Sequence, residues 1–199
     1  GPKGPQPKNG AEYVAAGCQA WAIACWRQLD DALLQLRFDH EEIGLIVLQT
    51  RGDRAALLQV ENDLAKDRGH WLCNEIVLHM ARVLRRFDLM ARSTYALVDK
   101  EACAAGAFLE LTLACDRVYA LDDDAVQMAF GPFHDGSLPM SHGHSRLDNR
   151  FLANPAQAKK LATEKPTLTG TEIDEQGLCT YLLDPVDWDD DVRIALEER

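Results

Sequence analysis

Apolar residues recur at helical spacing in three segments of the chain. Between Cys18 and Phe38 they fall at intervals of three and four, while Arg, Gln and Asp side chains fill the opposite face. The same pattern returns over residues 55–66 and 71–90. We therefore expect three amphipathic helices in the first half of the chain.

Short runs of apolar and β-branched residues alternate with these helices. They cover residues 43–49, 95–98, 117–121, 126–130 and 181–183. Runs of this length are typical of strands, and the first, continuously apolar, is typical of a strand covered on both faces. Residues 104–115 are nearly all apolar and predict a buried helix, with further helices near residues 156–162 and from Asp187. Strands separated by helices require crossover connections, so the pattern predicts an α/β fold.

Composition narrows the class of protein. The chain has 199 residues, of which 47% are apolar, enough for one core. Its 21 basic and 32 acidic residues give a net charge of −11, which disfavours general binding to nucleic acids or to membrane surfaces. Residues 1–10 contain three prolines and three glycines and predict a flexible arm, followed by a single domain over residues 11–199.

Location and redox state follow from what the sequence lacks. No apolar run is long enough to cross a bilayer, and the first residues have no signal-peptide core. The six cysteines form no CxxC pair and suit a reducing compartment. We therefore expect a cytoplasmic protein.

Glu110 is the charged residue that is hardest to explain as ordinary core, because residues 104–115 contain no other. Burial raises the pKa of a carboxylic acid, which suits proton transfer. Alternatively, Glu110 lies at the edge of the apolar face and bonds to a neighbouring backbone group. Gly106 and Ala107 precede it at the predicted start of the helix, where free N–H groups can stabilise an oxyanion.

A second polar group lies in the loop around His134, Asp135, His142 and His144. His134 could act as an acid or base, and three imidazoles with a carboxylate could bind zinc or iron. The spacing matches no standard metal motif, however, so we favour a solvated loop and expect no metal or other cofactor.

The region from Ala96 to Ala120 resembles the signature of the crotonase (enoyl-CoA hydratase/isomerase) superfamily. A turn of small residues opens a helix carrying Glu110-Leu111, followed by Cys115-Asp116 and a strand. The resemblance is greatest to the second, C-terminal half of the benzoyl-CoA-dihydrodiol lyase branch, and it covers about residues 11–199. The other segments that carry it are 29–32, 69–71, 130–132, 145–147 and 187–199.

The resemblance implies a ββα superhelix that binds an acyl-CoA thioester and associates with other copies or halves through its C-terminal helices. It places the oxyanion N–H on Gly106-Ala107 and the first catalytic carboxylate on Glu110. The second carboxylate falls on Pro132, which cannot transfer a proton. The other oxyanion arm falls on Gly52 in a shortened loop. The family's opening hairpin has no counterpart before Cys18, and the C-terminal helices are also incomplete.

These departures lead to one leading hypothesis and two alternatives. The chain is expected to be half of a CoA-thioester lyase or hydratase of the type that cleaves the ring of 2,3-epoxybenzoyl-CoA in aromatic catabolism. It would contribute little chemistry alone, as a pseudoenzyme whose partner is another crotonase-like half or a second copy. Alternatively, it is an interaction module that has lost CoA binding. The third possibility is an active crotonase with a rearranged site built from Glu110 and His134.

Overall fold

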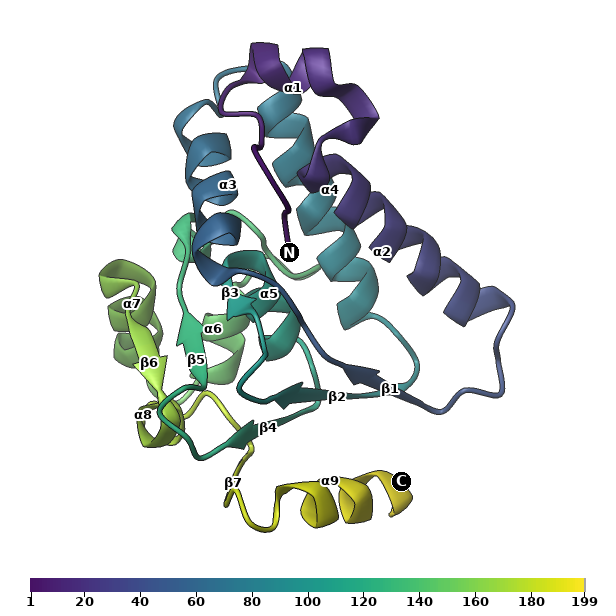
Figure 1. The fold of residues 1–199 in the computed structure, drawn as a ribbon, viewed down its shortest axis with the longest axis vertical. Helices are drawn as coiled ribbons and strands as arrows, with labels where there is room; N and C mark the ends of the chain where they lie inside the picture. The colour runs from purple at the N-terminus through teal and green to yellow at the C-terminus, as the bar shows by residue number, and fades with distance from the viewer. Residues whose placement is uncertain (199) are drawn as a thin grey trace.

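The computed structural model describes residues 1–198 and places a parallel sheet beneath a group of helices (Figure 1). The strand order is β1-β2-β4-β7, and every neighbouring pair is parallel. This arrangement confirms the predicted crossover connections. The four strands are β1 (Leu45–Leu48), β2 (Ser93–Val98), β4 (Arg117–Leu121) and β7 (Tyr181–Leu183).

The two faces of this sheet are packed separately because strand side chains alternate in direction. Ala96, Val98 and Val118 belong to the main core on the helical side. Tyr95 and Tyr119 point to the other face, where the amphipathic helix α9 (Trp188–Glu197) covers them. Figure 1 shows α9 lying across this face, away from the remaining helices. Arg199, the last residue of the predicted domain, lies outside the described residues.

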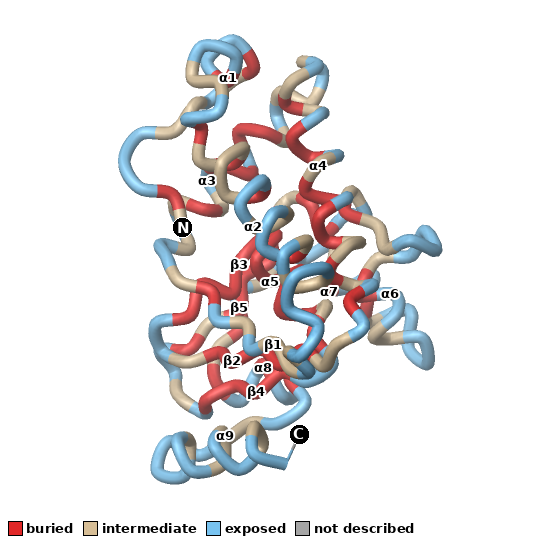
Figure 2. The backbone as a smooth tube through the Cα atoms, turned by 90° about the vertical axis from the view of Figure 1, so that its right-hand side faces the viewer, coloured by how far each residue is buried: buried red, intermediate tan, exposed pale blue. Residues whose placement is uncertain are grey.

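Three helices from the first half of the chain pack together on the opposite side. They are α2 (Trp21–Phe38), α3 (Arg54–Lys66) and α4 (Trp71–Asp88), as the periodicity predicts. Helix α2 begins three residues later than expected, after a short helix α1 (Gly10–Ala16) and the 3₁₀ turn η1 (Gly17–Gln19), neither of which was predicted. Figure 2 shows the most deeply buried backbone running through α4, β3, α5 and the strands.

A second, smaller sheet positions the site. Its order is β3-β5-β6, with β3 (Ala104–Ala105) parallel to β5 (Gln127–Ala129) and β6 (Thr167–Thr169) antiparallel to β5. Strand β3 runs directly into α5 (Gly106–Leu113). The other elements of this part are η2 (Pro132–Asp135), α6 (Arg146–Arg150), α7 (Pro155–Glu164) and α8 (Gly170–Glu175).

Two of the expectations for these elements were wrong. Residues 104–115 do not form one continuous helix, because Ala104 and Ala105 pair with β5 before α5 begins at Gly106. Strand β1 is an edge strand and is not covered on both faces, because the side chain of Val47 is exposed on one of them. Within residues 1–198, no helix combines the length and the apolar character needed to cross a bilayer.

Candidate functional site

The first turn of α5 holds the backbone N–H that the sequence predicts as an oxyanion donor. Gly106 leaves β3 with a φ of 49°, a left-handed conformation that L side chains rarely adopt. This turn directs the Ala107 N–H inward, where it donates to Oε1 of Glu61 at 2.7 Å. The donor therefore lies in the expected position, but it is already hydrogen-bonded to Glu61 of the same chain.

Glu61 reaches this position from α3. It lies on the buried stripe of that helix, four residues after Leu57 and three before Leu64, and only 1% of its surface is exposed. Its carboxyl group lies against two glycines, Gly106 and Gly131. A Cβ on Gly131 would lie 2.8 Å from Oε2, and one on Gly106 would overlap the carboxyl group. Because neither glycine has a side chain, the two leave space for one carboxyl group, and we call this space the cradle.

The environment of Glu61 keeps its carboxyl group protonated at neutral pH. Burial raises its pKa to about 8, the Ala107 N–H opposes that rise, and the nearby Glu110 adds to it. Within the described residues, Oε2 has no hydrogen-bond partner. The group is therefore a neutral acid with one oxygen bonded and the other unsatisfied, an arrangement that normally costs stability.

Glu110 lies one turn along α5 and has different surroundings. It is 2% exposed, and its Oε2 accepts a hydrogen bond from Nη1 of Arg146 at 3.0 Å. The same guanidinium donates to both carboxylate oxygens of Asp88, at 2.6 and 3.1 Å, and to the carbonyl oxygen of Leu138 at 2.9 Å. Arg146 thus joins two buried carboxylates from α4 and α5, and its charge compensates theirs.

His134 approaches Glu110 from the turn η2. Its Nδ1 lies 3.0 Å from the Gly131 nitrogen and 3.3 Å from the Gly131 carbonyl oxygen, so this glycine can pair with either neutral tautomer of the ring. Nε2 faces Oε1 of Glu110 at 3.7 Å, beyond hydrogen-bond distance. Burial lowers the pKa of His134, although Glu110 partly opposes the change. The imidazole is consequently neutral near pH 7.

The structure brings together four of the five residues that the sequence singles out. Gly106, Ala107, Glu110 and His134 surround the start of α5, and Pro132 begins the turn that carries His134. Together with the unpredicted Glu61, Asp88 and Arg146 they form what we call the α5 cluster.

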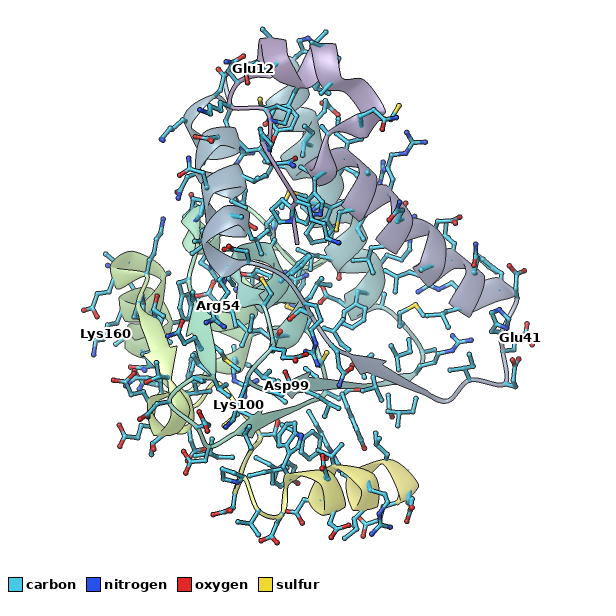
Figure 3. All side chains as sticks on the ribbon, viewed as in Figure 1. Glu12, Glu41, Arg54, Asp99, Lys100 and Lys160 are labelled. Atoms are coloured by element: carbon cyan, nitrogen blue, oxygen red, sulfur yellow. The ribbon has the colours of Figure 1, made fainter. Side chains whose placement is uncertain are left out.

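Gly52 lies apart from the α5 cluster, on a surface pocket of about 590 Å³. The pocket is also lined by Leu58 and Ala129, and by Arg54 and Lys100, which Figure 3 labels. A Cβ placed on Gly131 would meet Leu58 Cδ2 at 3.1 Å as well as Glu61 Oε2. Leu58 therefore touches both the pocket and the cradle of Glu61.

The sequence indicates the three unpredicted residues to different degrees. Glu61 interrupts an otherwise apolar stripe with Leu57 and Leu64, which is the same kind of signal that singled out Glu110. Asp88 and Arg146 are 58 positions apart, so no local pattern indicates their ion pair.

In the described structure, the three histidines of this loop do not come together with a carboxylate as a metal site would need. The side chains of His142 and His144 are exposed, with ring centroids 5.3 Å apart, whereas His134 is buried. In the part of the chain that the structure describes, no three His, Cys, Asp or Glu side chains are close enough to hold a metal ion.

Comparison with known proteins agrees with this architecture. No family model matches the chain. Benzoyl-CoA-dihydrodiol lyase of Aromatoleum evansii is 38% identical over 195 residues, which are 96% of this chain but 35% of that protein. The chain thus spans about a third of the length of this relative.

Solved structures show the same fold. The enoyl-CoA hydratase of Bacillus anthracis matches with a TM-score of 0.61 at 18% identity, over 88% of this chain and 66% of that one. Pseudomonas aeruginosa AtuE matches with a TM-score of 0.65, also at 18% identity and over 88% and 66% of the two chains. The resemblance read from the sequence is thereby confirmed: the chain is similar to benzoyl-CoA-dihydrodiol lyase over nearly its whole length and has the fold of the enoyl-CoA hydratases.

Proposed function

We propose that the chain is a crotonase-fold unit of a CoA-thioester lyase or hydratase of the benzoyl-CoA-dihydrodiol lyase type, and that it performs little chemistry alone. One observation carries the proposal: the Ala107 N–H already donates to Glu61 at 2.7 Å. An enzyme of this family needs that N–H for the thioester oxygen, and losing one such donor costs about 10²–10³ in rate.

The remaining groups of the α5 cluster support the same conclusion. Glu110 is held by Arg146 at 3.0 Å. The family resemblance puts the second carboxylate at Pro132, which has no side chain that can move a proton. Losing a general acid or base costs about 10²–10⁴ in rate, so these departures together predict very slow catalysis.

The missing chemistry would come from a partner. We infer that another crotonase-like half or a second copy supplies the working site, and that this chain contributes acyl-CoA contacts or structural support to it. The six cysteines are all free in the described structure, which supports the cytoplasmic location expected from the sequence.

Two alternatives make different predictions. The closed α5 cluster also suits an interaction module that has lost CoA binding. The approach of His134 Nε2 to Glu110 Oε1 at 3.7 Å instead suits an active site in which these two groups exchange a proton.

The first test is turnover by the chain alone. We expect no hydration of crotonyl-CoA and no cleavage of 2,3-epoxybenzoyl-CoA above the uncatalysed rate. Glu110→Gln and His134→Ala are expected to leave that result unchanged. Turnover that both substitutions abolish would overturn the proposal in favour of the Glu110 and His134 site.

Thermal denaturation separates a CoA-binding unit from an interaction module. Benzoyl-CoA is expected to raise the Tm with increasing concentration, because a ligand that binds only the folded state stabilises it by mass action. Benzoate and free CoA at the same concentrations are the matched controls. No shift at saturating benzoyl-CoA would show that the module hypothesis is the correct one.

A further inference from the structure

We propose that Glu61 is an intramolecular plug, which fills the carbonyl-binding position at the start of α5 and keeps the neighbouring pocket from reaching it. The ligand class that Glu61 displaces is a neutral carbonyl, as in a thioester or a carboxylic acid. This inference rests on the proposed function, because it explains why that position is not used.

The shape of the cradle is the first argument. Gly106 and Gly131 leave room for one planar carboxyl group, and adding a Cβ to either glycine would crowd it. Glu61 is 1% exposed, so its side chain lies wholly inside this space. A group of the size and shape of a carboxyl or thioester carbonyl therefore fits the cradle when Glu61 is absent.

The hydrogen bonds of the Glu61 carboxyl group also support the proposal. Glu61 Oε1 takes the Ala107 N–H at 2.7 Å, as a thioester oxygen would. Its Oε2, by contrast, has no partner within the described residues. Asp88 differs in this respect, because both of its carboxylate oxygens accept hydrogen bonds from Arg146. One bonded and one unsatisfied oxygen instead describe an occupant that can be replaced.

The pocket beside the cradle is a further reason for the proposal. Leu58, one turn before Glu61 on α3, lines the pocket that also contains Gly52 and Ala129. Leu58 and Glu61 both approach Gly131. Leu58 therefore adjoins both the pocket and the cradle, so the pocket lies one side chain away from the space that Glu61 fills.

The test compares Glu61→Ala with Glu61→Gln. Glutamine keeps the length of the side chain and an acceptor oxygen, so it remains a plug, whereas alanine vacates the cradle. Each variant and the wild type are titrated with propionamide and with benzoyl-CoA, and binding is followed by thermal shift and calorimetry. Propionamide carries an acceptor oxygen like that of the removed CH₂–COOH group on a chain one carbon longer, and equal concentrations of propanol serve as the control.

We expect propionamide to raise the Tm of Glu61→Ala and to have no effect on the wild type or on Glu61→Gln. We also expect Glu61→Ala to bind benzoyl-CoA about tenfold more tightly than Glu61→Gln, the ratio that one recovered hydrogen bond provides. Equal responses of Glu61→Ala and Glu61→Gln to both compounds would overturn the proposal that Glu61 is a plug.

Two outcomes are kept apart by design. If Glu61→Ala does not fold, Glu61→Asp replaces it, because its carboxyl is one methylene shorter and should release the Ala107 N–H. Failure of the proposed function would appear as turnover by the wild type, whereas failure of the plug would appear as identical propionamide responses, which do not depend on CoA chemistry.

Discussion

Two buried carboxyl groups, those of Glu110 and Glu61, lie on either side of the first turns of α5. Their hydrogen-bonding partners and their charge states differ. Glu110 belongs to an ionic group in which Arg146 bonds to both Glu110 and Asp88. Glu61 has no cationic partner in the described structure, accepts one backbone N–H, and keeps its proton near pH 7. The first arrangement compensates buried charge with charge, and the second avoids the charge altogether. This difference is what we expect if the Glu110 side of the α5 cluster is structural and the Glu61 side is a filled binding position, as proposed above.

The largest effect is expected from removing the guanidinium. Arg146→Met leaves the carboxylates of Asp88 and Glu110 buried without compensation, and we expect the free energy of unfolding to fall by about 3–5 kcal/mol. Urea denaturation measures this loss. Arg193→Met is the control, because the Arg193–Asp190 ion pair is exposed. We expect the control to cost no more than about 1 kcal/mol. Equal losses in the two variants would contradict the structural role of Arg146.

The next effect concerns the pH dependence of stability. Glu61 has a folded pKa of about 8, well above the ordinary value of a glutamic acid. The folded state therefore holds a proton that the unfolded state has released, and stability falls as pH rises toward 8. Between pH 6.5 and 8 we expect the free energy of unfolding to fall by about 1–2 kcal/mol in total, because the slope halves as pH reaches the folded pKa.

Glu61→Gln cannot ionise and should remove this slope. His134 acts in the opposite direction, because its lowered pKa makes stability fall as pH decreases, and most of that effect lies below about pH 6.5. Urea denaturation at several pH values measures both slopes. A wild-type curve that is as flat as that of Glu61→Gln would show that Glu61 is ionised in the folded protein.

A smaller effect is expected from crowding the cradle. The Cβ of Gly131→Ala would lie 2.8 Å from Glu61 Oε2 and 2.9 Å from Gly106 Cα. We expect a loss of about 1–2 kcal/mol in the wild-type background and a smaller loss together with Glu61→Ala, because the carboxyl oxygen is then gone. A double-mutant cycle measures the difference. Additive losses would mean that Glu61 does not fill the space beside Gly131.

Much of the fold could be predicted from the sequence because its longer elements have strong periodicity. The helices α2, α3 and α4 and the strands β2 and β4 lie where the apolar pattern places them. The errors occur where tertiary pairing decides the structure. Ala104 and Ala105 have good helix propensity, yet they pair with β5, and β1 is an edge strand although its sequence is continuously apolar.

The candidate site could be predicted only in part. The family resemblance and the isolated charge of Glu110 indicated the start of α5, and the structure adds His134 from η2 to the same place. The role of Glu61 depends on how α3 crosses α5, which no sequence spacing reveals. The pairing of Asp88 with Arg146 likewise joins elements that are distant in the chain.

The most direct test of the account is the backbone amide of Ala107 in the wild-type protein, followed by NMR as pH is varied. The N–H donates to Glu61 at 2.7 Å, so its chemical shift should change as Glu61 ionises. We predict a midpoint near pH 8, the raised pKa of this buried acid, and no such transition in Glu61→Gln. An Ala107 amide that does not titrate, or that titrates equally in both proteins, would contradict the claim that Glu61 occupies the carbonyl position.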